Sequence, residues 1–182
     1  MLEYHHLQSP TVIGTLQLGA PKELREQWAK EAYNLTATSY ITNLYGQMSS
    51  FYVWEETKIY DQLLKKILTI INETYIPTAY EKHLSCEEHK LIKYDIAEAW
   101  TAIYREGEFA KPHSHYPYPL AFCYYIKVGE NSTPIIFNDL NFSIKPKDDM
   151  LIIFNAHIFH SVPSHKGKDR IIAAGNLNLP KK

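Results

Sequence analysis

The sequence has little cysteine, almost no net charge and no long apolar run. Its two cysteines, Cys86 and Cys123, form no CxxC pattern, so neither a disulfide framework nor a thiolate zinc site is expected. With 19 basic and 20 acidic side chains, the chain has no overall field that would attract nucleic acid or an anionic membrane. Apolar runs such as MLIIF at 150–154 are too short to cross a bilayer, and the N-terminal stretch MLEYHHLQSP has no apolar segment typical of a signal peptide. A single cytoplasmic domain of 182 residues is therefore expected.

The first 90 residues are predicted to form a mainly helical support region. PKELREQWAKEAY at 21–33 begins with a proline, which suits a first helical turn, and it spaces Leu24, Trp28 and Ala32 as on one helix face. EETKIYDQLLKKILTIINETYIP at 55–77 carries a stripe of isoleucine and leucine, and Pro77 is expected to end this second helix. Between them, residues 39–54 predict extended segments around one glycine.

From about residue 91 to 182 the pattern changes to short strands separated by turn residues. They are predicted at 90–105, 120–128, 133–139, 141–146, 150–156 and 169–179. Many short strands with no helix-length gap between them indicate antiparallel sheets. The expected fold is therefore mainly β (α+β), a jelly roll supported by the N-terminal helices. Asp148 and Asp149 lie in a turn of this region and are expected to be solvated.

Five of the nine histidines fall between residues 113 and 165. In KPHSHYPYPL at 111–120, strand alternation would turn His113 and His115 to the same side. His160, at the end of a later strand, is the natural third member of a facial set for Fe(II) or Zn(II). Arg170 follows ten residues later and could hold a carboxylate with its planar fork. By itself, an H-x-H pair in a loop is more often solvated than bound to a metal.

The order H-x-H, H-x-V-P and an arginine ten residues past the last histidine resembles the Fe(II)/2-oxoglutarate-dependent oxygenases. The chain is most similar to a family of small 2-oxoglutarate oxygenases of bacteria and phages, related to the prolyl 4-hydroxylases. The similarity covers most of the sequence and includes TNLYGQMSSFYVWEE, AWTAIYREGEFAKPHSH, AFCYYIKV, PKDDMLIIFNAHIFHSVP and RIIAAGNLN. The resemblance implies a double-stranded β-helix, with Fe(II), 2-oxoglutarate and O2 as cofactors.

The resemblance also implies a role for individual residues. His113 and His160 match the two metal histidines, and Arg170 matches the residue that binds the distal carboxylate of 2-oxoglutarate. Tyr125 matches a tyrosine that often shares this carboxylate. His115 occupies the position where the family usually has Asp or Glu. It completes an all-histidine set, or lies outside the metal shell while water or 2-oxoglutarate fills the gap, or marks a degenerate or non-iron site. The first interpretation is favoured because histidine here is similar to the small family's own pattern.

Five further residues are weaker candidates for contacts in the same pocket. Tyr104, in the Y-x-x-G motif, is a candidate to face the same pocket as the co-substrate. Asn176 shares strand parity with the arginine, so it is a candidate for co-substrate or substrate contact. Trp100, Tyr116 and Tyr118 are candidates for the substrate rim, with core packing the alternative for Trp100 and solvent exposure the alternative for the two tyrosines.

The resulting hypothesis is a 2-oxoglutarate-dependent dioxygenase, specifically a hydroxylase. It would act on an unactivated C–H bond of a peptidyl residue or a small metabolite and release succinate and CO2. The alternatives are a cupin-like jelly roll that binds a metal or ligand without redox activity, and a jelly roll that serves only as an interaction module.

Overall fold

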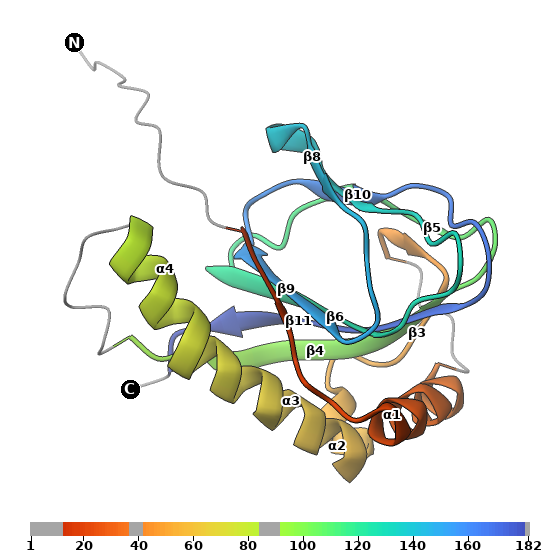
Figure 1. Ribbon diagram of the computed structural model, residues 1–182, viewed down its shortest axis with the longest axis horizontal. Coiled ribbons are helices and arrows are strands. Elements are labelled where there is room, and N and C mark those ends of the chain that lie inside the picture. The colour runs from red at the N-terminus through yellow and green to blue at the C-terminus, as the bar shows by residue number, and fades with distance from the viewer. Residues whose placement is uncertain (1–12, 37–41, 84–91, 181–182) are drawn as a thin grey trace.

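Two antiparallel sheets face each other, and helices cover the outer face of the larger sheet (Figure 1). The computed structural model describes residues 13–36, 42–83 and 92–180, so Cys86 and the stretch MLEYHHLQSP lie outside the described residues. The six-stranded sheet has the order β1-β9-β6-β11-β4-β3, and the five-stranded sheet has the order β2-β5-β10-β7-β8. The mainly β jelly roll expected from the sequence is confirmed.

The strands are β1 (Ile13–Gln17), β2 (Leu44–Tyr45), β3 (Gln47–Met48), β4 (Asp95–Tyr104), β5 (Phe109–His113), β6 (Leu120–Lys127), β7 (Ile135–Phe137), β8 (Phe142–Ile144), β9 (Met150–Asn155), β10 (His160–Val162) and β11 (Arg170–Asn178). Three of them come from the N-terminal half of the chain: β1 pairs with β9, β2 with β5 and β3 with β4. The first 90 residues therefore complete both sheets, in addition to supplying the helices.

The helices are α1 (Lys22–Leu35), α2 (Val53–Glu56), α3 (Lys58–Ile70) and α4 (Ile76–His83). Val53 and Trp54, predicted to be extended, belong to the short helix α2, together with the first two residues of the predicted second helix. The prediction that Pro77 ends the second long helix is wrong, because a π-helical turn, Ile71–Tyr75, leads directly into α4. Pro77 falls in the first turn of α4, where its missing N–H and its ring are easiest to accommodate. No helix in the described part of the chain is both long and apolar enough to cross a membrane.

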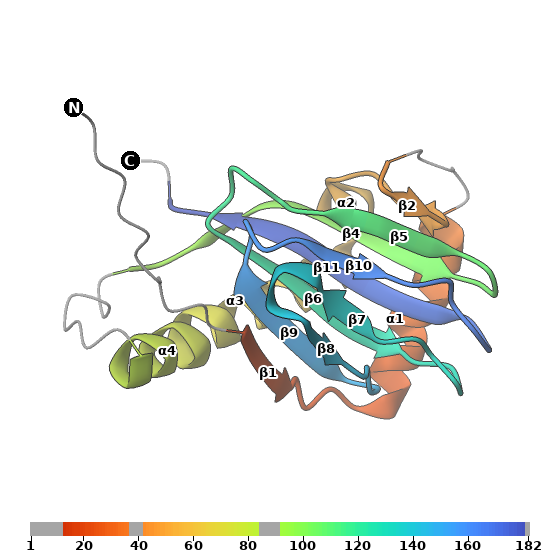
Figure 2. The same cartoon turned by 90° about the horizontal axis from the view of Figure 1, so that it is seen from above.

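The central strands are buried on both faces, which creates two apolar layers. Along β6, Phe122 and Tyr124 belong to the layer between the large sheet and the helices, where Trp28 also packs. Cys123 and Tyr125 point the other way, into the layer between the two sheets. This alternation follows from the period of two along a strand. Figure 2 shows the stacked sheets from above, with the smaller one, which includes β5 and β10, lying over the larger.

Asp149 holds the N-terminal segment against β6 and β9. Its carboxylate accepts hydrogen bonds from the backbone N–H groups of Gly19 (2.8 Å) and Ala20 (3.1 Å), and from the Tyr124 hydroxyl (2.8 Å). The residue is buried, with a positive φ of 66° that aspartate tolerates better than most side chains. The expectation of a solvated turn acid is therefore wrong for Asp149. Asp148 matches it better, because its side chain is half exposed in an ion pair with Arg25.

The substitution Asp149→Ala is expected to lower the free energy of unfolding by about 3 kcal/mol, since it leaves buried donors without an acceptor. Denaturant titration of the purified chain measures this loss. Asp148→Ala is the matched control: because its ion pair is partly exposed, it should cost about 1 kcal/mol or less. Equal losses for the two variants would contradict the structural role of Asp149.

Candidate metal centre

A cavity of about 360 Å³ lies between the two sheets. Three neighbouring strands of the large sheet form its floor, and their register arranges the floor in rows. On β4 and β11, Tyr104 faces Arg170 at one end of the cavity, and Glu98 faces Asn176 at the other. Between these rows lie Ile172 and Ala174 of β11, flanked by Ala102 and Trp100 of β4 and by Tyr125 and Cys123 of β6. The small side chains in these middle rows, Ala102, Ala174 and Cys123, leave space for the cavity beside the larger Trp100 and Tyr125.

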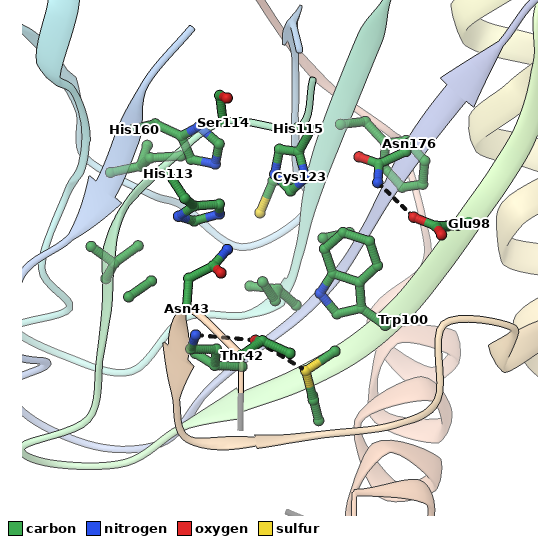
Figure 3. A pocket seen from close by; sticks show the side chains of 18 of the residues that line it. Thr42, Asn43, Glu98, Trp100, His113, Ser114, His115, Cys123, His160 and Asn176 are labelled. Atoms are coloured by element: carbon green, nitrogen blue, oxygen red, sulfur yellow. Dashed lines mark hydrogen bonds between the residues drawn. The ribbon is translucent and has the colours of Figure 1, made fainter. Parts of the chain in front are cut away.

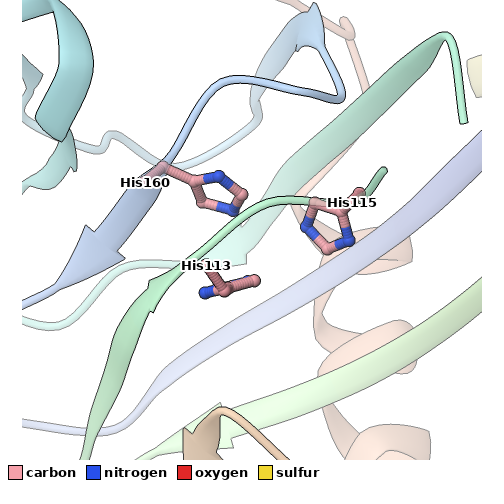
Figure 4. Close-up of side chains that lie close together, drawn as sticks. All are labelled: His113, His115 and His160. Atoms are coloured by element: carbon pink, nitrogen blue, oxygen red, sulfur yellow. The ribbon is translucent and has the colours of Figure 1, made fainter. Parts of the chain in front are cut away.

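Three histidines on the opposite wall meet above this floor (Figure 4). His113 ends β5 and His160 begins β10, and the two residues face each other directly in the strand pairing. His115 lies in the following loop, where its backbone N–H donates to the Ala156 carbonyl at 2.7 Å. One ring nitrogen from each histidine lies within 4.8 Å of those from the other two. Strand pairing and one loop hydrogen bond therefore bring three potential ligands together at one point.

Hydrogen bonds leave the correct ring nitrogens available for a metal. The Nδ1 of His113 donates to the Lys111 carbonyl at 2.7 Å, and the Nδ1 of His160 donates to the Ile158 carbonyl at 3.1 Å. A ring that donates through Nδ1 has its lone pair on Nε2, which is the usual way a protein orients a ligating imidazole. Among the hydrogen bonds of the described residues, none involves the ring of His115. That ring instead lies 5.8 Å, centroid to centroid, from the indole of Trp100.

The three imidazoles are held neutral, as metal ligation requires. Burial, with a further contribution from the other two histidines, lowers the pKa of His115 to about 3. Burial and the neighbouring His113 lower the pKa of His160 to about 4. Burial also lowers the pKa of His113. A set of three neutral nitrogen donors fits Fe(II), Zn(II) and related ions.

Arg170 presents a buried positive charge to the same cavity. It is 1% exposed, and one guanidinium nitrogen donates to the Thr133 carbonyl at 2.9 Å. The guanidinium carbon lies 4.2 Å from the ring centre of Tyr104 and 6.0 Å from that of Tyr125. Its Nε has no hydrogen-bond partner, and no carboxylate among the described residues forms an ion pair with it. Because a buried charge is costly without a partner, this arginine is suited to receive a carboxylate from a ligand.

The ten residues singled out in the sequence all line this one cavity. They are His113, His115, His160, Arg170, Tyr125, Tyr104, Asn176, Tyr116, Tyr118 and Trp100. Tyr116 is the most exposed of the candidates, at 78%, whereas Arg170, Tyr125 and Tyr104 are buried together. The sequence reasoning missed Glu98, which hydrogen bonds with Asn176 (Figure 3). Strand alternation could have identified it, since Glu98 lies two residues before Trp100 and therefore faces the same side of the strand.

Comparison with known proteins places the fold. No family model matches the chain, and no curated protein matches it in sequence. The structure is similar to the viral collagen prolyl hydroxylase vCPH from Paramecium bursaria Chlorella virus-1 in its 2-oxoglutarate complex, with a TM-score of 0.64 and 17% identity over 91% of this chain and 94% of that one. It is similar to a Pseudomonas putida prolyl-4-hydroxylase, with a TM-score of 0.64 and 14% identity over 93% of each chain. HygX from Streptomyces hygroscopicus, solved with nickel and 2-oxoglutarate bound, matches with a TM-score of 0.62 and 8% identity over 92% of this chain and 83% of that one. The chain therefore has the jelly-roll fold of these prolyl hydroxylases and of HygX.

Proposed function

We propose that this protein is an Fe(II)- and 2-oxoglutarate-dependent oxygenase that hydroxylates an unactivated C–H bond. The observation that carries the proposal is the pairing of two features in one cavity. Three neutral histidines converge on one point, and a buried arginine without a carboxylate partner faces the same space. The first feature suits a divalent metal, and the second suits the far carboxylate of a dicarboxylic acid. Two structures of the same fold contain 2-oxoglutarate.

His113, His115 and His160 would hold the metal. Arg170 would bind the distal carboxylate of 2-oxoglutarate, and the Tyr125 hydroxyl would share it. Burial raises the pKa of Tyr104 to about 12 and also raises that of Tyr125 well above its ordinary value, so both phenols stay protonated and can donate to a carboxylate. Neither tyrosine adds a negative charge that would compete for the guanidinium.

When bound, Fe(II) and 2-oxoglutarate supply an oxygen-activating centre. The overall reaction converts substrate C–H, O2 and 2-oxoglutarate into substrate C–OH, succinate and CO2. The residues of this chain contribute position and environment. The apolar middle of the floor, which includes Ile172 and Ala174, keeps the space between the metal site and the substrate poor in water. The substrate would be a peptidyl residue or a small metabolite, entering past Tyr116 and Tyr118.

Anaerobic titration with Fe(II) and then 2-oxoglutarate is expected to give the weak visible charge-transfer band of the metal-bound keto acid. In Arg170→Gln, the 2-oxoglutarate concentration needed for half of this band should rise by about 30-fold, because a charged partner of the carboxylate is lost. Fe(II) affinity should stay unchanged. Arg105→Gln removes an arginine that is partly exposed and does not line the cavity, and it should leave both affinities unchanged.

The same titration separates the oxygenase from a cupin-like jelly roll without redox activity. An oxygenase should release succinate when the complex is exposed to O2, even without its own substrate. Metal binding without a band and without succinate would favour the cupin-like alternative. A band that Arg170→Gln leaves unaltered would overturn the assigned co-substrate position.

A further inference from the structure

The end of the cavity away from Arg170 carries two polar side chains to which the proposed reaction assigns no role. It is formed by Glu98 of β4 and Asn176 of β11, which face each other in the strand pairing. The Asn176 amide nitrogen donates to a Glu98 carboxylate oxygen at 2.9 Å. Figure 3 shows this pair on the side of the cavity away from His113 and His160. Both residues line the cavity, so a ligand inside it can reach them.

Asn176 has a buried acceptor that no described residue satisfies. The residue is 4% exposed, and its Oδ1 has no hydrogen-bond partner. Exchanging the positions of the amide oxygen and nitrogen would not give the oxygen a partner, because only the nitrogen can donate to the Glu98 carboxylate. Buried polar atoms rarely lack a partner, and on a cavity wall that partner is water or a ligand that displaces the water. The missing partner must therefore be a hydrogen-bond donor.

The second acceptor at this end carries a negative charge. Within residues 13–36, 42–83 and 92–180, no lysine or arginine forms an ion pair with Glu98. The nearby phenol of Tyr118 has a raised pKa, caused by burial and then by the Glu98 carboxylate, so it stays neutral. Trp100, two residues from Glu98 on the same strand face, adds an aromatic ring of the kind that attracts cations. A carboxylate, an amide oxygen and an indole together favour a cationic donor.

The two ends of the cavity therefore differ in charge. Arg170 and Asn176 are six residues apart on β11, a strand distance of about 20 Å. The buried cation lies at one end, the Glu98 carboxylate lies at the other, and the histidines lie over the space between. A dicarboxylic acid would be attracted to the arginine end and repelled from the glutamate end. This leaves the glutamate end for the substrate.

We propose that Glu98 and Asn176 form a subsite for a positively charged nitrogen group, an ammonium or a guanidinium, on the substrate. The inference rests on the proposed function, because it names the class of substrate for that same site. The group would donate to the Glu98 carboxylate and to the Asn176 Oδ1 while lying against Trp100. The C–H bond to be hydroxylated would then belong to the part of the substrate that extends from this anchor toward the histidines.

Binding of a simple cation to the metal-free chain tests the subsite. Ligand-observed NMR should show that n-pentylammonium binds about 10-fold more tightly than 1-pentanol, its neutral counterpart, and that valerate does not compete with it. Glu98→Gln keeps the shape and can still accept from Asn176, but it should remove this preference for the cation. Glu106→Gln makes the same charge change in an exposed turn outside the cavity and should leave the preference intact.

The location of binding is read from the indole signals. The chain has three tryptophans, and the signal lost in Trp100→Phe identifies the one in the cavity. That signal should shift with n-pentylammonium in the wild type and not in Glu98→Gln. Equal binding of the amine and the alcohol, an unaltered preference in Glu98→Gln, or an unshifted Trp100 signal would each overturn the proposal.

This test uses neither iron nor 2-oxoglutarate, so its outcome is separate from that of the charge-transfer titration. Cation binding in a chain that forms no 2-oxoglutarate chelate would retain the subsite and reject the oxygenase. A chelate that forms in a chain without cation preference would retain the oxygenase and reject the subsite.

Discussion

His160→Ala is expected to lower the affinity of the chain for Fe(II) by more than about 100-fold. Loss of residues that merely support a metal ligand costs 10–100-fold, and the loss of one ligand in three should exceed that. His160 is buried, its ring is oriented by the Ile158 carbonyl, and it faces His113 across the strand pair. Nothing else among the described residues can replace it, because these three histidines are the group found there with ligand spacing. Anaerobic equilibrium dialysis measures the change.

His157→Ala is the matched control, since this histidine is exposed three residues away and does not line the cavity. It should bind Fe(II) as the wild type does. A loss in His160→Ala that is no larger than that in His157→Ala would mean that the three histidines are not a metal site. Circular dichroism at the same temperature checks that both variants are folded.

The role of His115 is tested by the same measurement. In an all-histidine set, His115→Ala should lose Fe(II) affinity as His160→Ala does. His115→Asp should retain measurable affinity, because a carboxylate is also a ligand for iron. Unchanged affinity in His115→Ala would place this residue outside the metal shell, which is the second of the interpretations left open by the sequence.

The sequence could predict the jelly roll and part of the cavity floor because both depend on strand periodicity. Arg170 and Asn176 lie on one side of β11, and alternation turns both toward a common space, whereas Tyr125 is expected from the family resemblance. The meeting of His113 with His160 depends on pairing between β5 and β10, which local pattern does not specify; there the family resemblance supplied the expectation.

The features that the sequence did not predict depend on partners far along the chain. Asp149 looks like a turn acid until Gly19 and Tyr124 are placed beside it. Glu98 looks like the polar member of a strand until Asn176, 78 residues later, faces it. The helix continues past Pro77 because a π-helical turn precedes it, and proline alone does not reveal such a turn.

Metal-free protein is expected to lose stability steeply as the pH falls below 6.5. In the folded chain the pKa is about 3 for His115 and about 4 for His160, against about 6.5 in the unfolded chain. Below pH 6.5 the unfolded state therefore binds protons that the folded state excludes, so acid favours unfolding. Each histidine contributes a slope of up to about 1.4 kcal/mol per pH unit, which ends once the pH passes its folded pKa. Between pH 6 and pH 4.5 the two together should lower the free energy of unfolding by about 4 kcal/mol.

Denaturant titrations at several pH values, with a chelator present, measure this slope. His115→Gln has a similar polar shape but does not titrate, so it should reduce the slope by about 1.4 kcal/mol per pH unit. His157→Gln, at an exposed position, should leave the slope as it is in the wild type. Carboxylates that titrate in the same pH range contribute equally to the slopes of both variants. The difference between these two variants isolates the buried histidine. If they have the same slope, His115 is protonated as readily in the folded chain as in the unfolded chain, and the neutral nitrogen set required for metal binding does not exist near pH 6.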